Sequence, residues 1–233
     1  MTIKRPGGET MALEPLNSEL HRHLRAGAPV PDGRIFVPII ATEFAAAAAA
    51  CPILLSKSPE TGQFYVGAMF GFRPEEPPLT LDGVFVPLDV ERQAFFVSGE
   101  DIAVDLEHPR IAAGDSQPLF EEDGQPSERL RRIQHALARL TLGLEDTDAF
   151  IRALLDLKLI EPIDTSLSFD DGQTLRLQGL YTIARDSLRD LEDADAFRLF
   201  RAGYLQLAYT MLDSLEQIPI MARRRNQRLA QGL

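Results

Sequence analysis

The sequence has little that would let the protein form disulfide bonds or bind nucleic acid. Its 233 residues include one cysteine, Cys51, so no internal disulfide is possible. Lys and Arg number 24 against 35 Asp and Glu, which gives a formal net charge of −11. Because nucleic-acid binding depends on cationic side chains that neutralise phosphates, we expect no nucleic-acid partner.

Long apolar runs are also missing. The longest covers residues 44–55, whereas a membrane-spanning helix needs about 20 apolar residues. The first 20 residues include basic side chains but no apolar segment of the kind found in signal peptides. We therefore expect no membrane-spanning segment and a cytoplasmic location, which a single cysteine also suits.

What is present is typical of a globular protein, with 45% hydrophobic and 25% charged residues. The first half has alternating, β-branched and aromatic runs, and the second half has helical periodicity. We expect an α+β fold in which an antiparallel, β-rich N-terminal half packs with a helical C-terminal half. Repeated Pro and Gly predict a flexible N-terminal arm over residues 1–33, before a single domain over 34–222 and a basic tail over 223–233.

Six alanines in a row, residues 45–50, predict a short helix. Alanine is the best helix former, Thr42 can cap the helix and Glu43 suits its first turn. Pro52 ends it, because the residue before a proline is disfavoured in the helical region. Side chains this small let a helix lie close against a sheet or another helix, so we expect it to be buried against the core.

Further elements follow from pattern alone. We expect strands over residues 62–72, 84–90 and 93–108, with Pro87 at an edge or bulge. A helix begins at Ser127, a second begins near Asp146–Thr147, and a hairpin turns at Asp171–Gly172. A short helix covers 185–191. One last helix presents an inward face that steps by three or four: Phe197, Phe200, Tyr204, Leu207, Ala208, Met211, Leu215 and Ile218.

Six stretches together resemble the SapC family of bacterial proteins. They are FVPIIATEFAAAAAACPILL, VPLDVERQAFFV, PLFEEDGQPSERL, FIRALLDLKLIEP, DGQTLRLQGLYTI and MLDSLEQ, and they lie between residues 36 and 222. The family usually has an Arg-Arg-Tyr-Pro-Phe segment after a Trp and a Pro. Here that segment is Glu91–Phe95, in which Arg92 and Phe95 are kept and the Trp is absent. The resemblance implies an accessory role, since the family is associated with surface-layer systems and encoded near TonB-dependent receptors and flavin-dependent tryptophan halogenases.

Catalytic patterns are absent from the sequence. It contains no Gly-x-Ser-x-Gly elbow and no Walker loop. The four histidines, at 21, 23, 108 and 135, form no His-x-Asp or His-x-Glu pair for a non-haem iron triad. Cys51 stands at a helix end, where the dipole disfavours a thiolate. We therefore name no catalytic residue and expect no metal and no cofactor.

Four residues are candidates for binding a ligand or partner: Glu43, Arg92, Phe95 and His108. Glu43 is either a first-turn helix carboxylate or a buried acid that pairs with a cation such as Arg92. Phe95 is expected in the core. Arg92 either pairs with a carboxylate, faces a ligand groove or lies exposed on an edge strand. Residues three apart on a strand face opposite sides, so only a turn, bulge or helical kink would bring Arg92 and Phe95 together.

Together these observations favour a cytoplasmic accessory protein, without catalysis, that binds a protein or peptide partner. The alternative is an enzyme that modifies a peptide or small substrate beside an oxygenase or halogenase. A polar pocket that holds Glu43, Arg92 and His108 would favour the enzyme, and a broad apolar groove would favour the binding protein. The basic run 223–225 is interpreted as a solvated helix end, with anionic lipid or an acidic partner as alternatives. The sequence leaves the oligomeric state open.

Overall fold

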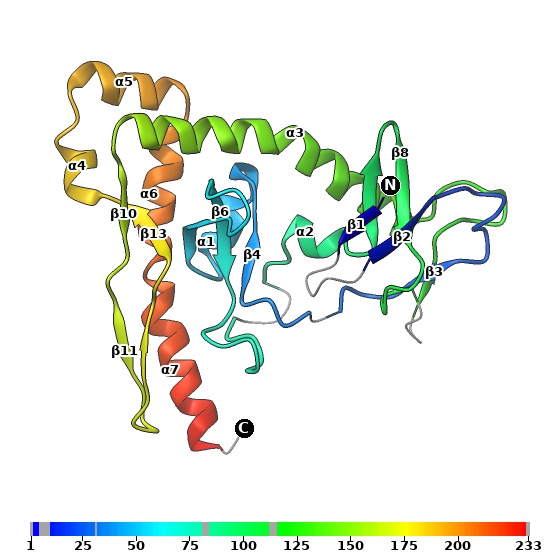
Figure 1. Ribbon diagram of the computed structural model, residues 1–233, viewed down its shortest axis with the longest axis horizontal. Coiled ribbons are helices and arrows are strands. Elements are labelled where there is room, and N and C mark those ends of the chain that lie inside the picture. The colour runs from blue at the N-terminus through cyan, green and yellow to red at the C-terminus, as the bar shows by residue number, and fades with distance from the viewer. Residues whose placement is uncertain (1, 5–9, 31, 81–83, 112–115, 232–233) are drawn as a thin grey trace. The chain divides into compact units, whose positions relative to one another are not determined.

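The structure, a computed structural model, describes residues 2–4, 10–30, 32–80, 84–111 and 116–231 (Figure 1). The chain divides into two compact units, each built from two separate segments. Unit 1 contains Met1–Asp32 and Leu88–Thr141, and unit 2 contains Gly33–Pro87 and Leu142–Leu233. The single domain over 34–222 that the sequence predicts stays a prediction. The longest helix, α3 (Glu128–Asp156), contributes residues to both units.

Unit 1 is built around a four-stranded antiparallel sheet of order β1-β2-β8-β7. Its strands are β1 (Thr2–Lys4), β2 (Thr10–Pro15), β7 (Phe95–Ser98) and β8 (Asp101–Asp105). A second pair joins β3 (Arg25–Ala26) to β9 (Gln117–Pro118). Residues 1–33 thus supply three strands, β1, β2 and β3, where the sequence predicts a flexible arm. The core consists of Ala26, Ala94, Phe95, Val104, Leu119, Phe120 and the α3 residues Leu130, Ile133 and Leu137.

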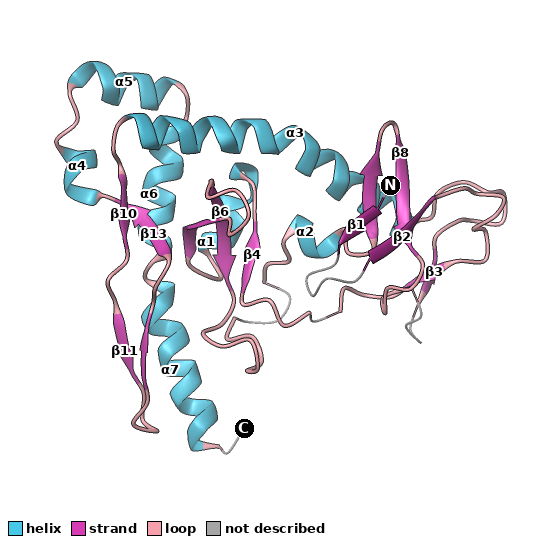
Figure 2. Ribbon diagram, in the orientation of Figure 1, coloured by secondary structure: helices cyan, strands magenta, loops and turns pink. Residues whose placement is uncertain are grey.

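Unit 2 contains a five-stranded antiparallel sheet of order β10-β13-β5-β6-β4. The strands are β4 (Phe36–Pro38), β5 (Ile53–Lys57), β6 (Phe64–Met69), β10 (Ile160–Pro162) and β13 (Leu180–Ile183). A hairpin of β11 (Ser166–Ser168) and β12 (Thr174–Arg176) extends beside α7 (Figure 2). The helices are η1 (Ala41–Glu43), α1 (Phe44–Ala48), α4 (Arg185–Arg189), α5 (Asp193–Arg201), α6 (Tyr204–Ser214) and α7 (Gln217–Ala230).

The α+β class is confirmed, with antiparallel sheets and a helical C-terminal half. Three of the predicted elements are wrong. The segment expected as a strand over 84–90 contains a short helix, α2 (Leu88–Glu91). The two helices expected after Ser127 are one helix, α3. The single last helix is three helices, because Gly203 at φ 77° separates α5 from α6 and a turn at residues 215–216 separates α6 from α7.

Gly143 lies inside α3, close to the point where the sequence predicts a second helix to begin. A Cβ at this position would lie 2.4 Å from Cδ1 of Ile40 and 3.3 Å from its Cβ. Four residues further along α3, the hydroxyl of Thr147 donates to the Gly143 carbonyl. The same hydroxyl accepts the Ala41 N–H at 2.9 Å. The glycine therefore lets the start of η1 approach the helix closely, and it marks a packing site rather than a helix end.

The alanine run packs on one side only. Ala47 and Ala50 are buried in the unit 2 core, whereas Ala45, Ala46 and Ala49 are exposed. The helix α1 packs against α6 and β5. The expected burial is therefore confirmed for one face of the run, and the small side chains on that face allow the close contact.

We expect Ala47→Leu to destabilise the protein by about 1–3 kcal/mol, because the larger side chain overpacks a filled core. The matched control is Ala46→Leu, one residue away on the exposed face, which is expected to change the free energy of unfolding by less than about 0.5 kcal/mol. Urea denaturation followed by circular dichroism measures both. Equal effects for the two variants would contradict the burial of one face.

Candidate partner-binding site

Arg92 pairs with a different carboxylate from the one suggested by the sequence. Its Nε lies 3.0 Å from Oδ1 of Asp89, and its Nη2 contacts the same oxygen. Its guanidinium also lies over the ring of Phe96, 5.3 Å from the centroid. Asp89 lies one helical turn before Arg92 and is its local partner, whereas the pairing with Glu43, which belongs to unit 2, stays a prediction.

Phe95 is fully buried in the unit 1 core, as the sequence predicts. A turn connects it to Arg92: the Phe95 N–H donates to the Arg92 carbonyl at 2.8 Å, and Ala94 adopts φ 73°. Positive φ is strained for a residue with a side chain, so tertiary contacts must hold this turn in place. The turn also lets the Arg92 Nη1 approach the Phe95 carbonyl at 3.4 Å.

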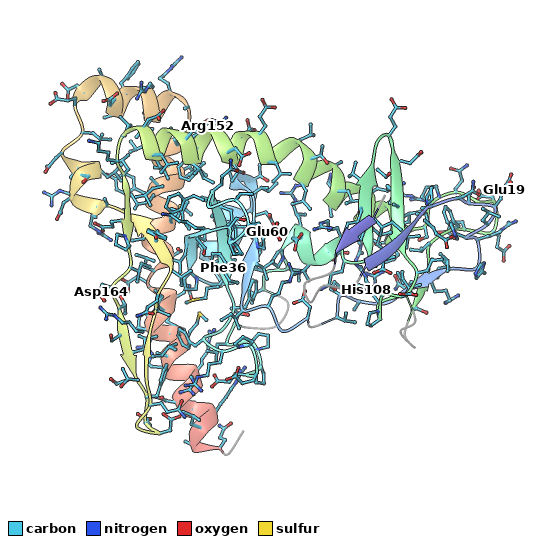
Figure 3. The ribbon with its side chains drawn as sticks, viewed as in Figure 1. Glu19, Phe36, Glu60, His108, Arg152 and Asp164 are labelled. Atoms are coloured by element: carbon cyan, nitrogen blue, oxygen red, sulfur yellow. The ribbon has the colours of Figure 1, made fainter. Side chains whose placement is uncertain are left out.

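His108 lies in a tight turn that follows β8 in unit 1 (Figure 3). Its backbone N–H donates to the Asp105 carbonyl at 3.2 Å, and its Nδ1 accepts the Arg110 N–H at 3.1 Å. Glu43 is buried in unit 2, where its Oε2 accepts the Ile40 N–H at 3.0 Å. Glu43 thus stabilises the start of η1 as a first-turn carboxylate, and it is also buried, as the other interpretation requires.

Arg110 is a buried residue of unit 1 that the sequence analysis did not identify as important. It is fully buried, and its Nε donates to the Gly27 carbonyl at 3.0 Å. Its Nη1 donates to the carbonyls of Gln93 and Glu91. Its Nη2 lies 3.7 Å from the Glu91 carboxylate, and burial lowers the pKa of the guanidinium while Glu91 raises it. Arg110 therefore links β3 to the turn that carries Arg92 and Phe95, and its acceptors are too far away in sequence to form a local motif.

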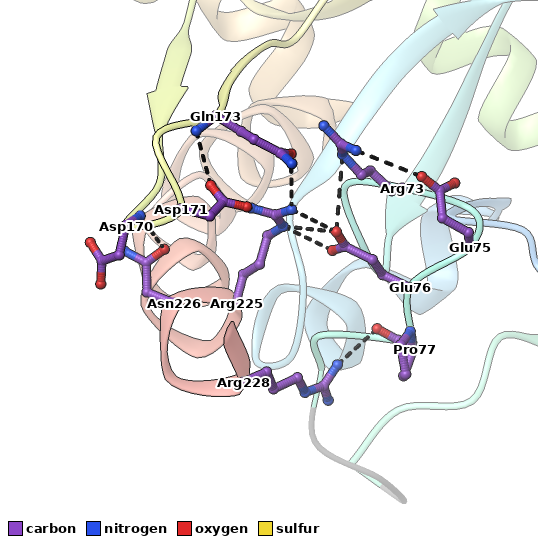
Figure 4. A network of polar contacts seen from close by, with 10 residues as sticks. All are labelled: Arg73, Glu75, Glu76, Pro77, Asp170, Asp171, Gln173, Arg225, Asn226 and Arg228. Atoms are coloured by element: carbon purple, nitrogen blue, oxygen red, sulfur yellow. Dashed lines mark hydrogen bonds and ion pairs between the residues drawn. The ribbon is translucent and has the colours of Figure 1, made fainter. Parts of the chain in front are cut away.

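The basic run at the end of the chain forms contacts within unit 2. The guanidinium of Arg225 lies 4.2 Å from the centroid of the Phe169 ring. Its Nη2 lies 2.7 Å from Oε1 of Glu76 (Figure 4). The hydrogen bond to Glu76 raises the pKa of Arg225, and burial opposes this rise. Arg228 and Arg224 donate to carbonyls of the loop that follows Glu76. These arginines hold α7 to that loop and to the hairpin, where the sequence predicts a basic tail.

Beside this network is a small pocket lined by Glu76, Pro77, Leu79, Arg225, Arg228 and Leu229. Its cavity of about 60 Å³ has room for only a few water molecules. Its arginines already have protein partners, and Glu43, Arg92 and His108 do not line it. It is therefore not the polar pocket that would favour the enzyme alternative.

The largest departure from the sequence pattern is on α5. The pattern predicts that Phe197 and Phe200 point inward, but the two side chains are 64% and 65% exposed. Leu199 is the α5 residue that is buried in the core. Because α5 ends at Gly203, the helix does not share the orientation of α6, and its aromatic pair faces away from the unit 2 core. The Ala202-Gly203 pair was the sequence signal for this break.

We name the exposed side of this helix the α5 aromatic face, which consists of Asp193, Ala194, Phe197, Phe200 and Arg201. All five side chains are exposed. On a helical projection they fall on one side, opposite Leu199. An aromatic pair with a charged residue at each end of the face is a typical composition for a protein-binding surface.

Comparison with family models shows one match over most of the chain, the SapC model, which matches residues 16–220. The chain belongs to the SapC family. No curated protein and no solved structure matches the chain. The match contains the α5 aromatic face and the turn that precedes Phe95, so both are within the family's region of this SapC protein.

Two general features of the SapC chain bear on its function. In the part of the chain that the structure describes, no helix is both long and apolar enough to cross a membrane. Among the same residues, no three side chains of His, Cys, Asp or Glu group together in a way that could hold a metal ion.

We expect Cys51 to be unreactive in the folded protein. Burial raises the pKa of its thiol from 9.0 to about 12, so the nucleophilic thiolate is scarce at pH 8. The pKa of this thiol is higher in the folded protein than in the unfolded one. Its contribution to stability is therefore complete below pH 9.0 and falls as the pH rises towards 12. Ellman's reagent at pH 8 should label Cys51 slowly in buffer and rapidly in guanidinium. Rapid labelling in buffer would show that Cys51 is accessible.

Proposed function

We propose that this SapC-family protein is a non-catalytic accessory protein that binds a protein partner through the α5 aromatic face. The observation that supports the proposal is the exposure of Phe197 and Phe200, 64% and 65%, on a helix whose other side is anchored in the core by Leu199. Exposed aromatic pairs are unfavourable in water and are enriched at the centres of protein interfaces. A partner that covers them would remove from water the part still exposed, about two thirds of the 150–250 Å² that such a side chain can bury.

We infer the class of partner from the family's associations, because the composition of the α5 aromatic face does not identify a protein outside the chain. The resemblance associates SapC proteins with surface-layer systems and with genes for TonB-dependent receptors and flavin-dependent halogenases. We therefore expect a protein or peptide of such a system as the partner, met in the cytoplasm. The acidic net charge of −11 argues against nucleic acid as a competing partner.

Affinity capture from extracts of the native host, followed by mass spectrometry, tests the proposal. The bait is the full chain as wild type, as the double variant Phe197→Ser/Phe200→Ser, and as the control Leu142→Ser. Leu142 is 77% exposed on α3, also in unit 2. A protein that is recovered with the wild type and the control, but not with the double variant, would support the proposal.

Stability measurements accompany the capture. Because both Phe side chains are already mostly in water, the double variant should keep the wild-type melting temperature within a few degrees. A partner retained equally by all three baits would place the binding surface elsewhere. Recovery of no reproducible partner by the wild type would contradict the proposed function.

A further inference from the structure

We propose that the α5 aromatic face binds the same face of a second copy of the chain, so that two α5 helices pack antiparallel about a twofold axis. This inference rests on the proposed function, because it assigns an occupant to the same face: a second copy of the chain, in place of the protein of a surface-layer or receptor system that the family suggests. Three observations support the inference: the order of the side chains along α5, their exposure, and the charges at the two ends of the face.

The residues of the face are arranged symmetrically about Phe197. In an antiparallel pair centred on this residue, Phe197 lies opposite Phe197 of the second copy. Phe200 and Ala194 of the other copy then lie at the same level on opposite edges of the contact, so each large ring lies beside a small exposed side chain. Asp193 lies opposite Arg201, so an acid meets a base at both ends of the contact. An isologous interface needs a surface that is complementary to itself under a twofold rotation, and these residues meet that condition.

Helix geometry places these groups on one line of contact. Asp193, Phe197 and Arg201 are spaced by four residues, and Phe200 lies next to this row on the same side. The row spans two turns, about 12 Å along the axis at 1.5 Å per residue. When the i±4 rows of two helices run parallel, at a crossing angle of about −50°, Asp193 of one row lies beside Arg201 of the other. Leu199 points the other way into the core, so the helix presents this face without rearrangement.

The charges on the face are available for a partner. Asp195 and Arg198 form an ion pair with each other at 3.1 Å, and so are already used within the helix. By contrast, the side chains of Asp193 and Arg201 make no hydrogen bond or ion pair with any other residue that the structure describes. They are the two charges that an opposed copy would pair.

The antiparallel arrangement is favoured over the parallel one. In a parallel pair, Asp193 would face Asp193 and Arg201 would face Arg201, so like charges would meet at both ends. Antiparallel packing also places the positive end of each helix dipole near the negative end of the other. A helix from another protein could also fit an aromatic face, but only a copy of α5 makes the Phe200–Ala194 and Asp193–Arg201 matches follow from this sequence.

Analytical ultracentrifugation over concentrations from low micromolar to near-millimolar tests the inference. The wild type should shift from the 25.9 kDa of one chain to twice that mass as concentration rises. Phe197→Ser should raise the dissociation constant of the dimer by about tenfold or more, the effect of removing an aromatic at the centre of an interface. The control Leu142→Ser should dimerise as the wild type does.

A charge-exchange experiment identifies the pairing itself. Asp193→Arg alone places arginine against arginine at both ends, and Arg201→Asp alone places aspartate against aspartate, so each variant should dimerise more weakly than the wild type. An equimolar mixture of the two variants recreates both opposite-charge pairs, and it should recover the wild-type association. Arg22→Asp, an exposed arginine of unit 1, controls for the change in net charge.

The outcomes separate this inference from the proposed function. A wild type that remains at 25.9 kDa at every concentration, or a mixture that does not recover association, would overturn the second-copy assignment. If such a monomer still captured a host protein through Phe197 and Phe200, the proposed function would stand with a different partner. A dimer that Phe197→Ser does not weaken would show that the copies meet through another surface.

Discussion

Replacing Arg110 with methionine is expected to lower the free energy of unfolding by about 3–5 kcal/mol, because three carbonyls lose a buried donor and Glu91 loses one of its two neighbouring cations. The substitution keeps a long apolar side chain but removes every donor. The carbonyls of Gly27, Glu91 and Gln93 then lose their buried partner, and the Glu91 carboxylate loses the cation 3.7 Å away. Each buried acceptor left without a donor adds to the loss.

Arg25 provides the matched control. It also donates to a carbonyl, that of Ser116 at 2.9 Å, but its side chain is exposed. Arg25→Met should therefore lower the stability by no more than about 1 kcal/mol, because water replaces the lost donor. Urea denaturation of both variants gives the comparison. Arg110→Lys should remain strongly destabilised, since one ammonium group cannot reproduce donors that point to three carbonyls. Full stability in Arg110→Lys would show that charge alone matters at this position.

Phe95→Ala is expected to destabilise the protein by about 3–5 kcal/mol, the loss seen when a buried aromatic leaves a cavity. Phe95 is fully buried between β8 and the first part of α3, among Val104, Leu130 and Ile133. The control is Phe96→Ala on the other face of the same strand. Phe96 is only half-buried and lies against Arg92, so its loss should be about 1 kcal/mol. Guanidinium unfolding monitored by circular dichroism distinguishes the two, and equal losses would mean that Phe95 is not the core residue of the pair.

The parts of the fold that could be predicted are those set by local pattern. Alternation and β-branched residues located β6, β7 and β8, and Asp171–Gly172 located the turn between β11 and β12. The helical period gave the start of α3 and its buried residues Leu130, Ile133 and Leu137. Period and turn chemistry act between near neighbours in sequence, so one sequence contains enough information to find them.

The parts that were missed depend on distant residues. The acceptors of Arg110 lie 83, 19 and 17 residues away along the chain, so no local pattern marks it as a buried link. Gly143 looks like a helix breaker until Ile40 is placed against it. Phe197 and Phe200 fit the apolar period of α6 well, and only the left-handed backbone at Gly203 turns them into an exposed face. Periodicity detects an amphipathic helix but does not tell whether its apolar side is covered.

The division of each unit into two chain segments has a consequence for the order of events during synthesis. In unit 1, Leu13 of β2 pairs with Asp105 of β8, so the early strand leaves the ribosome long before its partner exists. Unit 1 gains its part of α3 only near Thr141, and unit 2 gains α6 and α7 only after all of its other elements. Contacts between residues so far apart in sequence slow folding, because a long loop must close before they form. A nascent chain of this protein thus carries β2 with an unpaired edge through much of its synthesis, a period in which strand edges are prone to aggregate.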